Sequence, residues 1–126
     1  MKTRFYTLPD WDFVGGETQK RVLTLQKESG QKYDLPGATA HLAIVDFVNY
    51  HSAPVLAKEL QITQDGDGLY CVVTIPLSPS ETVNLSGKHI YQITVKDVNG
   101  NTSIPQKGIM HISYNIDRSF ILEGVN

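Results

Sequence analysis

The stretch KDVNGNTSIPQKGIMHISYNI, residues 96–116, predicts a β-hairpin, and this hairpin decides the fold class. Asn99-Gly100 lies between two apolar runs, and both residues tolerate the positive φ angles of a tight primed turn. On the return run, Met110, Ile112 and Tyr114 share one face because alternate side chains of a strand point the same way. The hairpin therefore supplies apolar side chains to a core and no catalytic group.

Earlier runs alternate apolar and polar residues between clusters of Gly, Pro, Asn and Asp, at a spacing typical of a β-sandwich or barrel. Residues 38–50 are apolar on both faces, with Ala43, Val45 and Phe47 on the second face. Such a strand is central in its sheet or covered on its second face. The alternation predicts the following core side chains: Leu23, Leu25, Leu69, Cys71, Val73, Ile75, Tyr91, Ile93 and Val95. For residues 38–50 it leaves open whether the core is lined by Ala40, Leu42 and Ile44 or by the opposite face.

Two stretches have a less certain local structure. PVLAKELQIT, residues 54–63, contains good helix formers, but the DGDG turn at 65–68 favours a strand that places Lys58 on the same face as its leucines. In PLSPSETVNL, residues 76–85, Ser80 is the expected N-cap of one short helical turn, with Glu81 near the positive end of its dipole.

The composition is that of an ordinary globular protein and predicts one domain over residues 1–126, 40% of them hydrophobic and 19% charged. The net charge of −2, with no basic run beyond Lys20-Arg21, predicts no nucleic-acid partner and no anionic membrane surface. No segment approaches the roughly 20 apolar residues of a membrane helix. The start, MKTRFYTLPDWDF, lacks the apolar stretch of a signal peptide, so we expect folding in the cytosol.

No group of residues has the spacing of a catalytic or metal site, so we expect no catalytic residue, cofactor or metal. His41 and His111 lie inside strand runs, which favours hydrogen-bonded structural roles, and the four histidines lack metal-ligand spacing. The single cysteine, Cys71, is predicted to be a buried, inert side chain. The acidic stretches 65–68 and 97–100 lack the continuation of a calcium loop and are interpreted as hairpin turns.

Aromatic and apolar residues at the two ends of the chain are the candidate interface. The N-terminal segment, residues 1–14, is expected to pack on the sandwich as an edge strand or on a partner, where aromatic residues contribute much binding energy. The short tail, residues 118–126, is half apolar and could pack back or lead into a partner. The candidate interface residues are Phe5, Tyr6, Trp11, Phe13, Phe120, Ile121 and Leu122.

The order of several turn-and-strand motifs gives a family resemblance. In this order, over roughly residues 10–115, they resemble the N-terminal domain of phage baseplate upper proteins, the BppU-type domain. The motifs are FVGG at 13–16, GQKYDLPGATA at 30–40, GLYCVVTI at 68–75, GKHIYQI at 87–93, DVNG at 97–100 and IPQKGIMHI at 104–112.

The resemblance implies an immunoglobulin-like β-sandwich of about seven to nine strands, with at most one short helical turn. It further implies a non-enzymatic structural or docking module of a phage or prophage tail baseplate, and it supplies no catalytic motif. The expected partners are other tail or baseplate proteins and further copies of the chain in the assembled particle. The expected location is the virion tail, after assembly in the host cytoplasm.

Two other function classes remain to be compared with this one. A carbohydrate-binding or adhesin-like surface module would use exposed aromatic residues, but it would need export. A small hydrolase would need a nucleophile, a base and an acid, and the sequence offers no such set.

Overall fold

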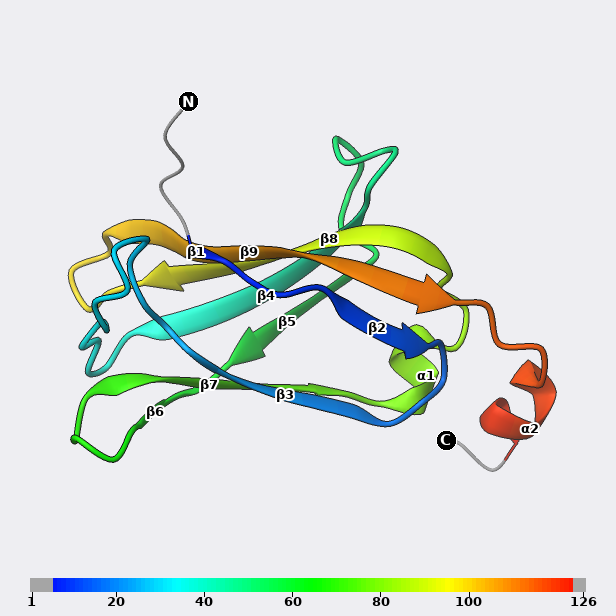
Figure 1. Ribbon diagram of the computed structural model, residues 1–126, viewed down its shortest axis with the longest axis horizontal. Coiled ribbons are helices and arrows are strands. Elements are labelled where there is room, and N and C mark those ends of the chain that lie inside the picture. Colours follow the sequence, from blue (N-terminus) through cyan, green and yellow to red (C-terminus); the bar gives the residue numbers. More distant parts are fainter. Residues whose placement is uncertain (1–5, 124–126) are drawn as a thin grey trace.

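The computed structural model describes residues 6–123, which form two β-sheets packed face to face (Figure 1). The prediction of an all-β sandwich is confirmed. Within the described range there are nine strands, six in the larger sheet and three in the smaller. Two short helices are also present, so the expectation of at most one helical turn is wrong.

The larger sheet has the strand order β1-β9-β8-β4-β5, and β2 also pairs with β9. Both β1 and β2 run parallel to β9, so they are successive segments along one edge of the sheet. The pairs β9–β8, β8–β4 and β4–β5 are antiparallel. The strands are β1 (Tyr6–Thr7), β2 (Trp11–Val14), β4 (Thr39–Asp46), β5 (Leu56–Leu60), β8 (Gly87–Lys96) and β9 (Thr102–Ser113).

The smaller sheet has the order β3-β7-β6, with both pairs antiparallel. Its strands are β3 (Gln19–Thr24), β6 (Ile62–Gln64) and β7 (Tyr70–Leu77). Only Gln61 separates β5 from β6, so the chain passes from the larger sheet to the smaller within one residue. The strand interpretation of residues 54–63 is therefore confirmed.

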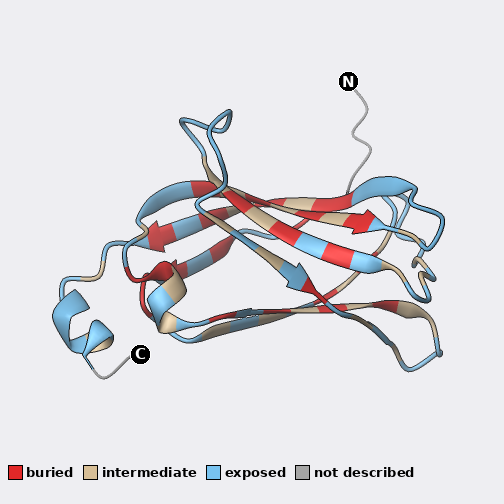
Figure 2. Cartoon of the chain, turned by 180° about the vertical axis from the view of Figure 1, so that it is seen from behind, coloured by how far each residue is buried: buried red, intermediate tan, exposed pale blue. Residues whose placement is uncertain are grey.

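The core fills the space between the sheets, and along most strands buried residues alternate with less buried ones (Figure 2). Every predicted core side chain in the runs 23–25, 71–75, 91–95 and 110–112 is buried. In β4 the structure shows that Ala40, Leu42 and Ile44 form the buried face. Leu69 is partly buried and packs against this core. Tyr114 is the exception, because β9 ends at Ser113 and the Tyr114 side chain is 57% exposed.

The hairpin between β8 and β9 is present, but its turn differs from the predicted primed turn. A primed turn of this kind needs a positive φ at Asn99, but among the described residues only glycines have one. Gly100 has a φ of 83°. The loop spans Asp97–Asn101, and the Asp97 carboxylate accepts the N–H groups of Asn99 and Asn101, both at 2.9 Å. The aspartate therefore stabilises the turn, and Asp65 holds the loop before β7 in the same way.

The helices α1 (Pro79–Thr82) and α2 (Arg118–Leu122) lie at the same end of the sandwich (Figure 1). The N-cap of α1 is Ser78, so the prediction of Ser80 is wrong by two residues. Proline is favoured in the first turn of a helix because its missing N–H has no partner there in any case. Pro79 occupies that position, and Glu81 accepts the Ser78 N–H at 2.8 Å.

Candidate interaction surfaces

Two of the predicted interface aromatics belong to the core. Trp11 and Phe13 face inward from β2 and are each 6% exposed. Their ring centroids lie 5.6 Å apart, and the Trp11 Nε1–H donates to Gln19 Oε1 at 3.1 Å. The prediction that they form an exposed partner surface is therefore wrong, and the edge-strand interpretation of this segment is confirmed. Phe5 and the side chain of Tyr6 lie outside the described part of the chain.

The predicted C-terminal residues lie on the surface, at the end of the molecule that carries α2. Phe120 is 69% exposed, Leu122 is exposed and Ile121 is partly buried. The segment before α2 is anchored by Asn115, whose Nδ2 donates to the Gly15 carbonyl at 2.7 Å. We call the exposed side chains of this region the tail patch, which consists of Tyr114, Ile116, Phe120 and Leu122.

A second apolar surface lies on the outer face of the larger sheet, and sequence reasoning did not assemble it. Val45 on β4 lies opposite Ile90 on β8, and Ile90 lies opposite Ile109 on β9. All three side chains are only partly buried, and we call this cross-strand row the apolar stripe. Its one sequence signal was the second apolar face of residues 38–50. The register of three strands was needed to join Val45 to the two isoleucines.

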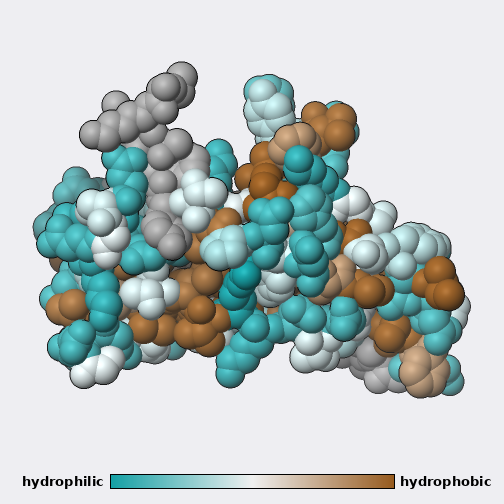
Figure 3. All heavy atoms as spheres, viewed as in Figure 1, coloured by the Kyte–Doolittle hydropathy of each residue, from teal (hydrophilic) through white to brown (hydrophobic). Residues whose placement is uncertain are grey.

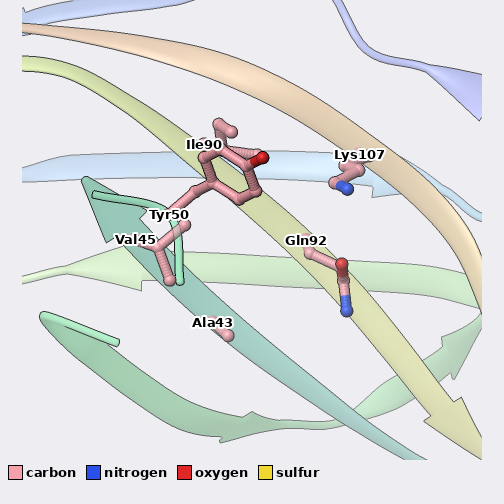
Figure 4. A pocket seen from close by; sticks show the side chains of 6 residues that line it. All are labelled: Ala43, Val45, Tyr50, Ile90, Gln92 and Lys107. Atoms are coloured by element: carbon pink, nitrogen blue, oxygen red, sulfur yellow. The ribbon is translucent and has the colours of Figure 1, made fainter. Parts of the chain in front are cut away.

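The loop between β4 and β5 stands above this face (Figure 1). Tyr50 from the loop lines a hollow of about 180 Å³ (Figure 4). In that view its ring lies beside Val45 and Ile90, while Gln92 and Lys107 stand on the opposite side. A second hollow of about 230 Å³ continues across β8 and β9 toward β1, and it shares Ile90 and Lys107 with the first. The stripe is thus the floor of a shallow apolar groove.

Lysines occupy the rows on both sides of the apolar stripe. Lys107 lies opposite Gln92 in the next row, and Lys88 lies opposite His111 on the other side. The Lys88 Nζ is 3.9 Å from the centroid of the Phe47 ring, at the base of the standing loop. The groove is therefore apolar along its floor, with a lysine in each bordering row, and the row of Lys88 continues through His111 to the carboxylates of Asp10 and Asp12.

The histidines and the cysteine lie in separate places and do not form a common site within the described residues. His111 meets Asp10 at 3.0 Å, which confirms a hydrogen-bonded role, whereas His41 is exposed on the outer face of β4. His89 is buried, with Nδ1 3.2 Å from the Gly87 carbonyl oxygen. Cys71 is buried, as predicted, and burial, followed by the nearby Asp65 carboxylate, raises the pKa of its thiol.

The acidic loop at 65–68 is a hairpin turn, as predicted. The Lys32 Nζ lies 2.8 Å from Asp65 Oδ2 and 3.2 Å from Asp67 Oδ2. The hydrogen bond from Lys32 holds the pKa of the Asp65 carboxyl far below its usual value. Within residues 6–123, no three His, Cys, Asp or Glu side chains are grouped so that they could hold a metal ion.

None of the helices described here is long and apolar enough to span a membrane. Comparison with protein-family models gave no match to this chain, and a search of curated proteins gave no significant match either.

Proposed function

We propose that this protein is a non-enzymatic structural module that works by docking onto other proteins, in the baseplate of a phage or prophage tail. The observation that carries the docking role is the distribution of exposed apolar side chains. They gather on the standing loop above the larger sheet and around the end that carries α2 (Figure 3). Contiguous exposed apolar surface on a folded domain marks a site of interaction.

The strand order supports the immunoglobulin-like part of the resemblance. In that fold, strands B, E and D lie side by side in one sheet, and strands G, F and C lie in the other, with C′ added beside C in variable-type domains. The order β3-β7-β6 corresponds to B-E-D, and β9-β8-β4-β5 corresponds to G-F-C-C′. The placement in a tail baseplate rests on the order of the sequence motifs alone.

A carbohydrate-binding role was based on exposed aromatic rings near the N-terminus. Trp11 and Phe13 are buried within the chain, so they offer no flat surface to a sugar. Other aromatic side chains are exposed, among them Tyr50, Tyr114 and Phe120, but they lie within the apolar surfaces described above, so we retain docking onto proteins as the proposed function.

Light scattering of the purified chain mixed with tail proteins of the same phage or prophage tests this proposal. We expect a complex with at least one of them, and we expect Ile90→Glu or Phe120→Glu to weaken it because each places a carboxylate on an apolar surface. Val22→Glu is the matched control, since Val22 is exposed on β3 of the opposite sheet. Failure to bind any tail protein, or equal weakening by the control, would contradict the proposal.

A further inference from the structure

We propose that copies of this chain associate head to tail, the tail patch of one copy docking on the apolar stripe of the next. This inference rests on the proposed docking function and names one partner of the docking surface. It starts from two apolar surfaces at separate positions on the same chain, one with exposed carboxylates beside it and the other with a lysine in each neighbouring row.

The tail patch presents apolar side chains together with carboxylates. Ile116 is 94% exposed, a very high value for an isoleucine, and Phe120 is the most exposed aromatic residue in the described range. Asp117 and Glu123 lie at the two ends of α2, and both are exposed. The one cation of this segment, Arg118, lies 5.0 Å from the Tyr114 ring centroid and donates to Asn84 Oδ1 at 3.4 Å. The segment is thus apolar with an acidic border.

The apolar stripe has the complementary chemistry. Its floor is Val45, Ile90 and Ile109, and the rows directly beside this floor contribute Lys88 and Lys107. The carboxylates of Asp10 and Asp12 lie farther out, at His111 on the edge formed by β2. Apolar burial gives most of the affinity in such contacts, whereas complementary charge fixes orientation and discourages wrong partners. An apolar segment bordered by carboxylates therefore suits this groove better than a basic one.

The two surfaces do not cover each other within one molecule. Phe120 and Ile121 border a hollow that Pro79 of α1 also lines, at the end of the sandwich. The stripe lies across the middle of the larger sheet, on β4, β8 and β9. Contact between two different surfaces is a heterologous interface, which builds a ring when the rotation closes and a filament when it does not. Either assembly would repeat the module around or along an axis.

Sedimentation equilibrium of two blocked variants, alone and mixed, tests the inference. Phe120→Glu places a carboxylate in the tail patch, and Ile90→Glu places one in the apolar stripe. Each variant thus lacks one of the two surfaces, so we expect each alone to stay at the monomer mass of 14.0 kDa. An equimolar mixture should reach twice that mass and no more, because one intact patch meets one intact stripe. The wild type should grow in mass with concentration. Ser119→Glu on α2 and Val22→Glu on β3 are the controls, and both should associate like the wild type.

Several outcomes would overturn the inference. A wild type that stays monomeric at every concentration excludes it, and so does a mixture that remains monomeric. If Phe120→Glu alone forms a dimer while Ile90→Glu does not, the stripe pairs with itself. A chain that is monomeric alone but binds a tail protein would end this inference and leave the proposed function intact. Circular dichroism of each variant shows whether it is folded, and Ile109→Glu replaces Ile90→Glu if the latter is not.

Discussion

Two long cationic side chains bridge the two sheets, one at each side of the sandwich, and the types of contact that they make differ. Arg21 extends from β3 of the smaller sheet toward the edge of the larger sheet, where it meets Pro9, Tyr91 and Trp11. Lys58 extends in the opposite direction, from β5 of the larger sheet to Pro76 and Glu81. Each is an inward-pointing charge on an edge strand, a feature that discourages edge-to-edge pairing with other chains.

The Arg21 side is built on aromatic packing. Its Nη1 donates to the Tyr91 hydroxyl at 2.8 Å and to the Pro9 carbonyl at 3.2 Å, and its guanidinium carbon lies 5.1 Å from the Trp11 ring centroid. Burial raises the pKa of the Tyr91 hydroxyl, although the guanidinium acts in the other direction. The Tyr91 ring fits over Gly108, where an added Cβ would lie 2.8 Å from a ring carbon. No carboxylate takes part in these contacts of the guanidinium.

The Lys58 side is built on an ion pair. Its Nζ lies 2.9 Å from Glu81 Oε2 and 2.8 Å from the Pro76 carbonyl oxygen, and the lysine and glutamate side chains are each 24% exposed. Glu81 also accepts the Ser78 N–H, so the same carboxylate holds the start of α1. The comparison indicates that the first side depends on shape and desolvated hydrogen bonds, whereas the second depends on charge.

Trp11→Ala should have the largest effect. It removes the ring that packs against Phe13, Tyr91 and Arg21, and a buried Trp-to-Ala change costs about 3–5 kcal/mol of unfolding free energy. Urea unfolding followed by circular dichroism measures this loss, because Trp11 is the sole tryptophan and its fluorescence disappears with it. A loss below about 1 kcal/mol would show that the aromatic packing matters little.

Arg21→Met should have the next largest effect. Methionine keeps an apolar stem but removes the donors to Tyr91 and Pro9, and losing hydrogen bonds of this kind costs about 1–2 kcal/mol. Because neither partner titrates in the acidic range, we expect the same loss at pH 4 and pH 7. A loss that vanishes at pH 4 would mean that a carboxylate supports Arg21 after all.

Breaking the Lys58–Glu81 pair should have the smallest effect and the clearest pH dependence. Burial acts to raise the pKa of Glu81, but the Ser78 N–H and Lys58 outweigh it, so the pKa lies below its usual value. A lowered folded-state pKa stabilises the protein above the unfolded-state value, and this stability is lost as the pH falls through the folded value. Glu81→Gln should therefore cost about 0.5–1.5 kcal/mol near neutral pH and nothing in strong acid.

A double-mutant cycle with Lys58→Met separates the pair from the cap. The coupling energy between Lys58 and Glu81 should account for part of the Glu81→Gln loss, and the remainder belongs to the Ser78 N–H. A coupling energy of zero at neutral pH would show that the ion pair does not stabilise the fold. If Glu81→Gln still lowers the free energy of unfolding in strong acid, the stabilisation by Glu81 does not depend on its charge.

The sequence predicted inward faces well because alternation is a local property of each strand. It even placed Lys58 among the leucines of residues 54–63, and the structure turns that lysine inward. It did not predict the partners of these cations, because Arg21 and Tyr91 are 70 positions apart. The same limit applies to the parallel pairing of β2 with β9, which decides that Trp11 and Phe13 are core residues.

The surface was harder to predict than the core. Phe120 and Leu122 are exposed, as the prediction of an apolar surface near the tail requires, whereas Ile121 is partly buried, and their role in an interface stays a prediction. The apolar stripe was missed because its three residues come from three strands whose register no local pattern encodes. The turn between β8 and β9 was predicted with the wrong type, because hydrogen bonds to the Asp97 side chain outweigh the preference of Asn99-Gly100 for a primed turn.

Inward side chains of this sandwich hold the fold, and we propose that its outward apolar side chains serve attachment. Adjacent residues on β8 separate these roles, because Tyr91 is buried in the core and Ile90 is partly exposed on the outer face. The most direct test is the concentration dependence of the mass of folded Ile90→Glu, measured by light scattering beside the wild type. We expect the mass of the wild type to rise with protein concentration and that of the variant to stay at the monomer value. An equal rise in both would contradict the proposal.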